Sequence, residues 1–454
     1  MAATAILPEG VAATTKVFHR KLNHEPLFID RAEGVYLYEA KTGRKILDGC
    51  GGAAVVSVGH AVPEIVKAVS EQIGRLPYIS SATFAHQEAE ELAEMFCIDS
   101  GMSRALFLTG GSEAAESAIK LCRQYHVENG ESERVNYIAR QKSYHGTTLA
   151  TLSLGRHGRR RAHFEPLFAD VFHEVSPCYA YRHKLDQESD EQYVARLGGE
   201  LDAKFQELGP GTVSAFFMEP VVGATTGCVP FVPGYMKMMR DVCDRHGALL
   251  VFDEIMCGFG RTGKLHAWQW EDCQPDVQIL GKGVNGGYSP LSVVLMNEKV
   301  VDVFRKGSGA FMNGYTYQSS GVGCRAALEC YKYIKKHNLV EQCHERGLLL
   351  EKLLNEKILP HPNVGDVRGK GLFWGVELIK NKATKEPFPA DHPVADLITA
   401  EAIRIGAVVY PGMKGAADGV LGDHVMLCPP YTISEDELEY LVDVLVESIK
   451  AVLG

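Results

Sequence analysis

Short apolar runs alternate with longer amphipathic segments through the middle of the chain. The apolar runs are Ala105–Leu108, Val135–Ala139, Val213–Met218, Ala248–Phe252 and Val277–Leu280. Continuous apolar strands that are separated by helices are typical of a parallel sheet covered on both faces. The pattern therefore predicts a large α/β domain, which we place at residues 65–325.

The two ends of the chain have a different pattern, in which short strand-like runs are mixed with separate helices. Near the N-terminus we expect strands at Pro26–Asp30 and Gly34–Tyr38, then helices at Pro63–Leu76 and Glu88–Phe96. After an apolar run at Leu291–Met296 we expect helices at about Gly321–His337, Leu339–Lys357 and Glu435–Val452, and strands at Gly371–Leu378, Ala407–Tyr410 and Val425–Cys428. Residues 1–64 and 326–454 are expected to form a smaller α+β domain together.

Charge and composition narrow the classes of function. The 454 residues carry a net charge of −10 without a long block of one sign, whereas a nucleic-acid binder normally presents a basic face. No apolar run approaches the roughly 18 residues that span a bilayer, and no charged region precedes an apolar core at the N-terminus, as in a secretory signal. The 12 cysteines show no CxxC spacing. We therefore expect reduced core thiols in a cytoplasmic protein without nucleic-acid or membrane partners.

Glycines and charged residues follow directly after four of the apolar runs. They are the turn Thr109–Ser112, the carboxylates Glu219 and Asp253, and Lys282 between two glycines. In open α/β sheets, ligands bind at the carboxyl ends of the strands. We therefore expect these residues to meet at one edge of the sheet.

The turn Thr109–Ser112 opens an amphipathic helix and is a candidate site for a phosphate group. Glycines let the backbone approach a ligand closely, and free N–H groups at a helix start bind anions. Gly110, Gly111 and Ser112 therefore form a candidate phosphate cup, although an ordinary strand–helix turn is the alternative. The turn is not a P-loop, because no Gly-Lys-Ser/Thr follows it.

Lys282 and Asp253 complete a combination that suits one cofactor. A partly desolvated lysine between glycines can have a lowered pKa and attack carbonyls, and a plain surface lysine is the alternative. A carboxylate at the end of an apolar strand needs a partner, and a helix cap or a core salt bridge is the alternative there. Phosphate cup, buried carboxylate and reactive lysine together fit pyridoxal 5′-phosphate (PLP). The carboxylate would hold its pyridine nitrogen and the lysine would be covalently attached.

The remaining motifs do not change this interpretation. Gly258–Gly263 fits GxGxxG, but no amphipathic helix follows it and no acidic residue lies about 20 positions further on. No HExxH, no Cys/His cluster at ligand spacing and no GxSxG elbow occurs, so we expect neither a metal site nor a serine nucleophile. Arg156, Arg159, Arg160 and Arg161 are expected to form a solvated face, which could also attract an acidic substrate group.

Seven short motifs, in this order, resemble those of the class-III (ω-) aminotransferases, which are PLP enzymes of fold type I. The motifs are Thr109-Gly-Gly-Ser-Glu-Ala, Ser143-Tyr-His-Gly, Glu219-Pro, Phe252-Asp-Glu, Gly260-Arg-Thr-Gly, Gly281-Lys-Gly and Gly314-Tyr-Thr. The resemblance extends from about Asp48 to Pro430. It implies a large domain with a mostly parallel seven-stranded sheet between helices, and a small α+β domain from both chain ends.

The resemblance also implies roles for individual residues. Lys282 matches the lysine that carries PLP and Asp253 the aspartate on its pyridine nitrogen, so these two are the expected catalytic residues. Gly111 and Ser112 match the phosphate-binding turn. Thr316 matches a threonine that reaches the phosphate of the neighbouring subunit, so the active unit is expected to be a homodimer.

Four further positions match residues around the PLP ring. Tyr144 matches the aromatic residue stacked on the ring and Ile255 the apolar residue on its other face, since aromatic faces stack on flat rings. Glu219 matches a glutamate near the cofactor that tunes substrate binding. His145 belongs to the same motif as Tyr144 and is also expected to bind the cofactor.

Two departures from the family pattern concern the substrate pocket. Tyr410 stands where many relatives carry an arginine that binds the substrate carboxylate. Either this recognition is lost, or another base such as Lys414 or Arg156 provides it. Ala53 and Ala54 lie where relatives place larger residues, which predicts a roomier pocket.

The expected function is therefore PLP-dependent transamination, in which an amine or ω-amino acid gives its amino group to a 2-oxo acid, pyruvate or 2-oxoglutarate. Lys282, once displaced by the donor, would act as general base on the substrate carbon. The same scaffold and the same two catalytic residues also serve aminomutases, decarboxylases and amino-alcohol phosphate lyases. A non-catalytic binding protein with this fold is the alternative from another class, and the intact Lys282 argues against it.

Overall fold

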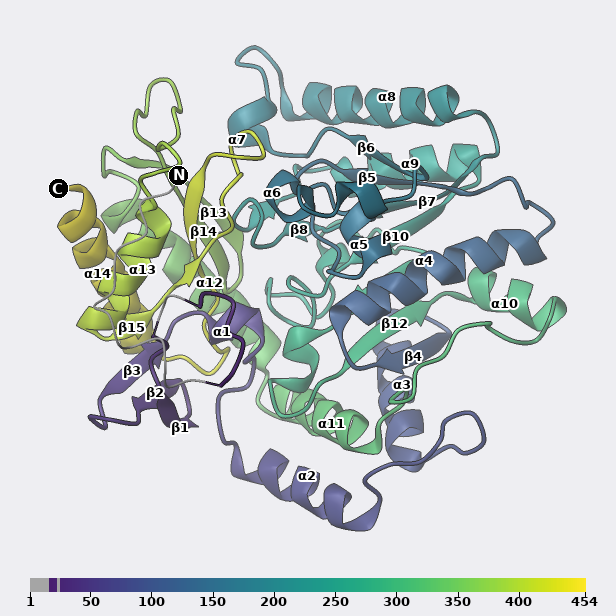
Figure 1. Cartoon of the computed structure of the whole chain (residues 1–454), viewed down its shortest axis with the longest axis horizontal. Coiled ribbons are helices and arrows are strands. Elements are labelled where there is room, and N and C mark those ends of the chain that lie inside the picture. Colours follow the sequence, from purple (N-terminus) through teal and green to yellow (C-terminus); the bar gives the residue numbers. More distant parts are fainter. Residues whose placement is uncertain (1–15, 23–24) are drawn as a thin grey trace.

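A seven-stranded sheet forms the centre of the structure. The computed structural model describes residues 16–22 and 25–454, and in this part of the chain the sheet has the order β4-β12-β11-β10-β7-β5-β6. Its strands are β4 (Arg104–Leu108), β12 (Ser292–Met296), β11 (Val277–Leu280), β10 (Leu249–Asp253), β7 (Val213–Met218), β5 (Asn136–Arg140) and β6 (Phe172–Val175). β12 runs antiparallel to both neighbours, and the pairs from β11 to β6 are parallel (Figure 1). The predicted mostly parallel sheet is thus confirmed.

Both faces of this sheet are covered, which explains why its central strands β7, β10 and β11 are buried at every position and mostly apolar. Phe217 and Val251 pack with α4 (Gly111–Glu128) on one face. Phe216 and Phe252, their neighbours along the same strands, pack with α8 (Asp190–Leu208) and α9 (Tyr235–His246) on the other. Successive side chains of a strand point to opposite faces, so two covered faces require a continuous apolar run.

A separate group of three helices lies against the β4 side of the molecule. It consists of α2 (Pro63–Arg75), α3 (Gln87–Ser100) and α11 (Gly321–Lys336), and α11 contacts both of the others (Figure 1). The rings of Phe96 on α3 and Tyr331 on α11 have centroids 5.1 Å apart, in the core between these helices.

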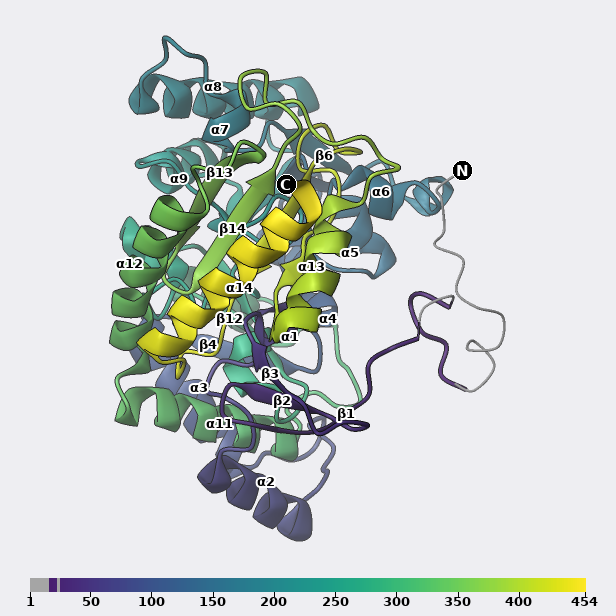
Figure 2. The same ribbon diagram turned by 90° about the vertical axis from the view of Figure 1, so that its left-hand side faces the viewer.

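The smaller part of the fold is built from both chain ends, as predicted. One of its sheets has the order β1-β2-β3-β15 and the other the order β13-β14-β17-β16. The strands are β1 (Ile29–Glu33), β2 (Tyr36–Glu39), β3 (Lys45–Asp48), β15 (Ala407–Val408), β13 (Val364–Lys370), β14 (Phe373–Leu378), β17 (Asp423–Leu427) and β16 (Tyr410–Pro411). β15 pairs in parallel with β3 and so joins the two ends. Figure 2 shows α13 (Val394–Ile405) and α14 (Glu435–Leu453) side by side, with α12 (Leu339–Lys357) on the same side of the molecule.

Short elements complete the described chain. They are α1 (Gly51–Ala54), α5 (Leu149–Leu154), α6 (Gly158–Arg161), η2 (Glu165–Leu167), α7 (Ala180–His183), β8 (Val221–Val222), β9 (Val229–Pro230), η3 (Ala267–Trp270), η4 (Lys282–Asn285) and α10 (Glu298–Lys306). The exact limits that we placed at residues 64/65 and 325/326 between the two domains stay a prediction.

Two differences from the predicted elements have a clear physical cause. The first strand covers Ile29–Glu33 rather than Pro26–Asp30, and Pro26 has no N–H group to donate to a strand ladder. β13 was not expected because its sequence is polar and glycine-rich. Its Arg368 is nevertheless buried, since the guanidinium lies 2.6 Å from the carboxylate of Glu377 on β14. The strand is held by an ion pair instead of by apolar contacts, and an apolar pattern is what would have predicted a strand in the sequence.

The cysteines behave as expected from their spacing. All twelve lie in the described residues as free thiols, and each is buried except Cys97, which is half-buried. Among the described helices none combines the length and the apolar character needed to cross a bilayer. The described residues also contain no group of three or more His, Cys, Asp or Glu side chains arranged to hold a metal ion.

Arg261, in the segment that fits GxGxxG, connects the central domain with both chain ends. Its side chain is 1% exposed and donates to the carbonyl oxygens of Leu372, Pro429 and Val56. The guanidinium also lies 4.6 Å from the centroid of the Tyr431 ring. Because these carbonyl groups come from three distant parts of the chain, Arg261 holds the two domains in one arrangement.

Replacing Arg261 by alanine should therefore destabilise the protein strongly. Three buried carbonyl oxygens would lose a charged donor and a cavity would form, so we expect a loss of about 3–5 kcal/mol in the free energy of unfolding. Denaturant titration measures this loss. Arg404→Ala is the control, because that side chain is 71% exposed, and it should change stability by less than about 0.5 kcal/mol. Equal stability of the two variants would contradict the role of Arg261.

Candidate active site

One cavity of about 200 Å³ collects most of the residues predicted for the site. It lies where β7, β10 and β11 end, at the edge of the sheet to which parallel strands bring their carboxyl ends. The predicted residues among its lining are Gly111, Ser112, Tyr144, His145, Glu219, Asp253, Ile255 and Lys282. Gly146, Val221, Ala224, Met256 and Cys257 complete the lining and were not predicted.

Asp253, the last residue of β10, is held in a fixed position although it is 4% exposed. One carboxylate oxygen, Oδ1, accepts the backbone N–H of Ile255 at 3.1 Å. The other, Oδ2, lies 2.9 Å from Nδ1 of His145. A buried carboxylate requires such partners, and both leave part of the oxygen surface free to bind a donor in the cavity.

His145 supports Asp253 from the loop that follows β5. Because a carboxylate only accepts hydrogen bonds, the contact places a proton on Nδ1 of the imidazole. The other nitrogen, Nε2, is buried and has no partner among the described residues. The sequence motif identified this histidine but not its contact with Asp253.

Lys282 begins the short helix η4 directly after β11, with a backbone φ of +46°. This left-handed conformation is uncommon for a residue with a side chain and is often found at functional sites. Burial lowers the pKa of the Lys282 amine, and the carboxylates of Asp253 and Glu219 act in the opposite direction. The amine is therefore shifted toward its neutral, nucleophilic form.

Glu219 is a second buried carboxyl group of the cavity. Burial raises its pKa, and the negative charge of Asp253 adds to this rise, while His145 and Arg140 oppose it. Oε1 accepts the backbone N–H of Gly223 at 3.4 Å. Oε2 has no partner in the described part of the chain. The group is thus placed to donate a hydrogen bond when protonated, or to accept one when ionised.

The predicted anion cup, whose role stays a prediction, lies at the start of α4, where the N–H of Gly110 donates to the Glu113 carboxylate at 3.3 Å. A Cβ atom on Gly111 would lie 2.8 Å from Cδ1 of Ile255, so a larger residue here would require the Ile255 side chain to shift. Oγ of Ser112 accepts the backbone N–H of Thr147 at 3.0 Å, which leaves its own O–H free to donate. The N–H groups of the first helical turn have no partner within the helix, so the cup can bind a phosphate.

These residues fit PLP as the cofactor. The cup offers donors to a phosphate, Asp253 offers a carboxylate to a ring nitrogen, and Lys282 offers an amine for covalent attachment. His145 and Glu219, each with one buried atom that has no partner among the described residues, line the same cavity. The donors of the cup, the Asp253 carboxylate and the Lys282 amine thus belong to the lining of a single cavity in the structure as it stands.

Four predicted residues do not line this cavity. Thr316 is exposed, in the segment between α10 and α11. Ala53 and Ala54 lie in the irregular turn α1, whose Ala54 carbonyl oxygen is near Gly283, the neighbour of Lys282. Tyr410 is half-buried in β16. Their predicted roles stay predictions.

The expected solvated face of arginines is wrong for three of its four members. Arg159 is exposed, whereas Arg156, Arg160 and Arg161 are half-buried. Arg156 pairs with Glu174 at 3.5 Å, and Arg161 donates to backbone carbonyl groups of α5 and the residue that follows it. The guanidinium of Arg160 lies 4.5 Å from the centroid of the Tyr144 ring. These residues pack back onto the fold because carbonyl oxygens and an aromatic face lie within their reach.

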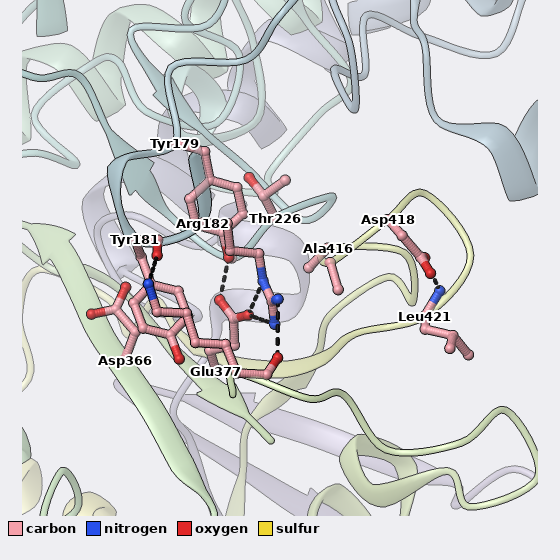
Figure 3. Close-up of polar contacts among 12 residues, drawn as sticks. Tyr179, Tyr181, Arg182, Thr226, Asp366, Glu377, Ala416, Asp418 and Leu421 are labelled. Atoms are coloured by element: carbon pink, nitrogen blue, oxygen red, sulfur yellow. Dashed lines mark hydrogen bonds and ion pairs between the residues drawn. The ribbon is translucent and has the colours of Figure 1, made fainter. Parts of the chain in front are cut away.

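A buried charged cluster lies near the site and had no signal in the sequence. Figure 3 shows Arg182 of α7 directed at Glu377 of β14, with the hydroxyl of Tyr179 bound to the same carboxylate. The side chain of Lys142 donates to the carbonyl oxygens of Ala416 and Ala417 at 3.4 and 2.7 Å. These contacts attach the 412–422 loop of the small domain to the large domain. They join residues that are more than 150 positions apart, so spacing along the chain could not reveal them.

Comparison with known proteins gives one consistent result. The family described as aminotransferase class-III matches residues 17–449. An uncharacterized aminotransferase of Schizosaccharomyces pombe is 42% identical over 96% of this chain and 95% of its own. A probable mitochondrial gamma-aminobutyrate transaminase of Oryza sativa subsp. indica is 32% identical over 94% of this chain and 82% of its own.

Solved structures give the same picture. An amine transaminase from an uncultivated Pseudomonas species, in its PLP-bound form, superposes with a TM-score of 0.90 at 30% identity, covering 97% of this chain and 100% of that one. The omega transaminase of Pseudomonas jessenii in complex with PMP has a TM-score of 0.87 at 30% identity, covering 94% of each chain.

The charge of Asp253 should control the pH at which Lys282 reacts. The carboxylate opposes the lowering of the pKa of Lys282, so Asp253→Asn should lower this pKa further. The neutral amine is the nucleophile, and the rate at which PLP attaches to the apoprotein should therefore reach its midpoint at a lower pH. Absorbance during reconstitution over a pH series measures this midpoint.

Asp276→Asn provides the matched control for that experiment. Asp276 is also buried, but its carboxylate binds Arg240 and the N–H of Leu250, away from the cavity. This variant should lose stability without moving the midpoint. A midpoint that stays constant or rises in Asp253→Asn would contradict the proposed coupling.

Proposed function

Because the chain belongs to the class-III aminotransferases and is a PLP-dependent transaminase, we propose that it transfers the amino group of an amine or ω-amino acid to a 2-oxo acid, pyruvate or 2-oxoglutarate. The observation that carries the proposal is the shared cavity of Lys282, Asp253 and the α4 cup. Bound PLP supplies an electron sink that acidifies the hydrogen on the amine-bearing carbon of the substrate.

We assign the proton transfer to the amine of Lys282. Its lowered pKa increases the share of the neutral amine, the form that can accept a proton as a general base must. The left-handed backbone at Lys282 and the short helix η4 fix the point from which the side chain enters the cavity. The same amine would then donate this proton to a carbon of the bound cofactor.

The role of Asp253 is to keep a positive charge on the ring nitrogen of the cofactor. A preorganised carboxylate stabilises charge that develops during the reaction without having to reorient. Its contacts with His145 and the N–H of Ile255 hold it in place, so His145 acts as a positioning residue. Glu219, with a raised pKa and a free Oε2, is proposed to hydrogen-bond the cofactor or the substrate.

The proposed class of amine donor is supported by the similar transaminases and by the small residues of the substrate pocket. Transaminases of amines and of gamma-aminobutyrate both align with most of this chain, which supports an amino group on a carbon without an α-carboxylate. The small side chains Ala53 and Ala54 near Gly283 support a roomy substrate pocket.

A homodimer is proposed as the active unit. Thr316 is exposed together with Met312 and Tyr317, which are 83% and 60% exposed. The ring of Tyr317 touches that of Tyr78 edge-on, with centroids 5.7 Å apart, and Tyr78 is itself 45% exposed. Such a concentration of exposed apolar side chains supports a protein interface. A second copy seated there would bring Thr316 to the α4 cup of its partner.

The free thiols support a reducing compartment, because disulfides form mainly in oxidising ones. We therefore propose that the protein works in the cytoplasm.

The proposed reaction predicts two linked observations. The absorbance of lysine-bound PLP should disappear when an amine donor is added and return with pyruvate or 2-oxoglutarate, and one amino acid should form for each oxo acid consumed. Borohydride reduction should leave the cofactor on Lys282. Lys282→Ala should lower the rate about 10⁴-fold, because the general base is lost.

Lys67→Ala is the control, since that side chain is 78% exposed on α2. It should keep the activity of the wild type. Conversion of the donor without consumption of the oxo acid would instead indicate an aminomutase, a decarboxylase or a phosphate lyase.

The dimer proposal predicts that Thr316→Val weakens cofactor binding. A hydrogen bond from an uncharged donor to a charged group contributes about 1.5–3 kcal/mol, so PLP should dissociate about 10- to 150-fold more readily. Equilibrium dialysis measures the affinity, and light scattering should show a dimer for both proteins. A monomer that is fully active would refute the arrangement.

A further inference from the structure

We propose that Arg160 binds the carboxylate of the substrate, and this inference rests on the proposed transamination of ω-amino acids and 2-oxo acids. It gives the chain a carboxylate-binding residue, although Tyr410 stands where many relatives carry an arginine. Arg160 comes from α6 of the large domain rather than from the C-terminal loop.

The position of Arg160 is defined by the ring of Tyr144. The guanidinium lies 4.5 Å from the centroid of this ring, in the geometry of a cation–π contact. Tyr144 itself lines the cavity that contains Lys282 and Asp253. Arg160 is therefore in direct contact with a residue that lines the reaction site.

The other contact of Arg160 is with the loop of residues 412–422. Nε of Arg160 lies 2.9 Å from Sδ of Met413, and the N–H of Met413 donates to the carbonyl oxygen of Ala224, which lines the cavity.

Lys142 holds the loop through the carbonyl oxygens of Ala416 and Ala417. Within the loop, Oδ1 of Asp418 accepts the N–H of Leu421 at 2.6 Å (Figure 3). The loop thus fixes the stem of Arg160 without neutralising its charge.

The guanidinium of Arg160 has no carboxylate partner in an ion pair of the described residues. Arg156, four residues before it, pairs with Glu174, and Arg161 is bound to backbone carbonyl oxygens. A thioether and an aromatic face satisfy little of the hydrogen-bonding capacity of a guanidinium, which has five N–H donors. Among the three half-buried arginines of the group, Arg160 is therefore the one that is left to bind an anion, whereas Arg159 is exposed.

The positive charge of Arg160 acts on the pKa of two groups that belong to the proposed site, Lys282 and Tyr410. Its positive charge contributes to lowering the pKa of the Lys282 amine, after burial as the main cause. The same charge opposes the rise that burial causes in the pKa of Tyr410. A substrate that reaches Lys282 with its amino group would therefore place a distant carboxylate within the influence of Arg160.

A carboxylate is the ligand that matches this arrangement. Guanidinium groups bind carboxylates through two parallel hydrogen bonds, and the planar fork is already oriented by its contact with the Tyr144 ring. The phosphate of the cofactor has its own donors at the α4 cup, so Arg160 remains for the substrate.

Comparison of 4-aminobutyrate with butylamine tests the inference, because the two donors differ by one carboxylate. In Arg160→Met, which keeps an apolar stem against Tyr144, kcat/KM for 4-aminobutyrate and for 2-oxoglutarate should fall about 10- to 100-fold, mainly through KM. Values for butylamine should fall much less, because this donor has no carboxylate and is affected only through the contribution of Arg160 to the pKa of Lys282. Arg160→Lys should restore part of the loss, since it keeps a charge but not the fork.

Binding of glutarate to the holoenzyme gives a readout that does not depend on turnover. Calorimetry should show glutarate binding about 10- to 100-fold more weakly to Arg160→Met than to the wild type. Arg159→Met, an exposed neighbour on the same short helix, is the matched control and should leave both measurements unchanged.

Three outcomes would overturn the inference. They are unchanged glutarate binding in Arg160→Met, an equal loss for butylamine and 4-aminobutyrate, or weaker retention of PLP in place of weaker carboxylate binding. Failure of the wild type to transaminate any donor would refute the proposed function instead, and the glutarate measurement would still decide whether Arg160 binds a carboxylate.

Discussion

The contact between the Asp253 carboxylate and the His145 ring is the interaction on which the site depends. Burying a negative charge is costly, and here the cost is offset by two fixed donors, one from a side chain and one from the backbone of Ile255. The same charge acts on its neighbours, since it opposes the fall in the pKa of Lys282 and contributes to the rise in the pKa of Glu219. One buried carboxylate therefore influences the pKa of an amine and of an acid that line the same cavity, in addition to the effect of burial.

The architecture delivers these groups to one place through the sheet. β7, β10 and β11 are parallel neighbours, so the residues that follow them meet at one edge. The helices on the two faces of the sheet do not cover that edge. The small domain is attached to the large domain through Arg261 and the charged cluster around Glu377. The buried charges that line the cavity and those that join the two domains are thus different sets of residues.

The sequence predicted the central fold well because its signals are local. An apolar run such as Val213–Met218 needs no distant information to be read as a covered strand, and Asp253 and Lys282 were found simply as the residues that follow such runs. Tyr144, His145 and Ile255 required comparison with family motifs. β13 and the surroundings of Arg160 could not be predicted, because their character comes from partners far away in the chain, Glu377 for Arg368 and Met413 for Arg160. The arginine group was misjudged for the same reason, since a run of like charges says nothing about the carbonyl groups and rings that the fold brings to it.

The way in which Lys142 holds the 412–422 loop has an evolutionary consequence. Its ammonium group binds main-chain oxygens, which every amino acid possesses, and so the anchorage does not depend on which side chains the loop carries. Mutations in this loop can exchange one residue for another while the path of the polypeptide is preserved. A scaffold of this kind can acquire new preferences by small steps, because altering what the loop presents does not require rebuilding how it is attached.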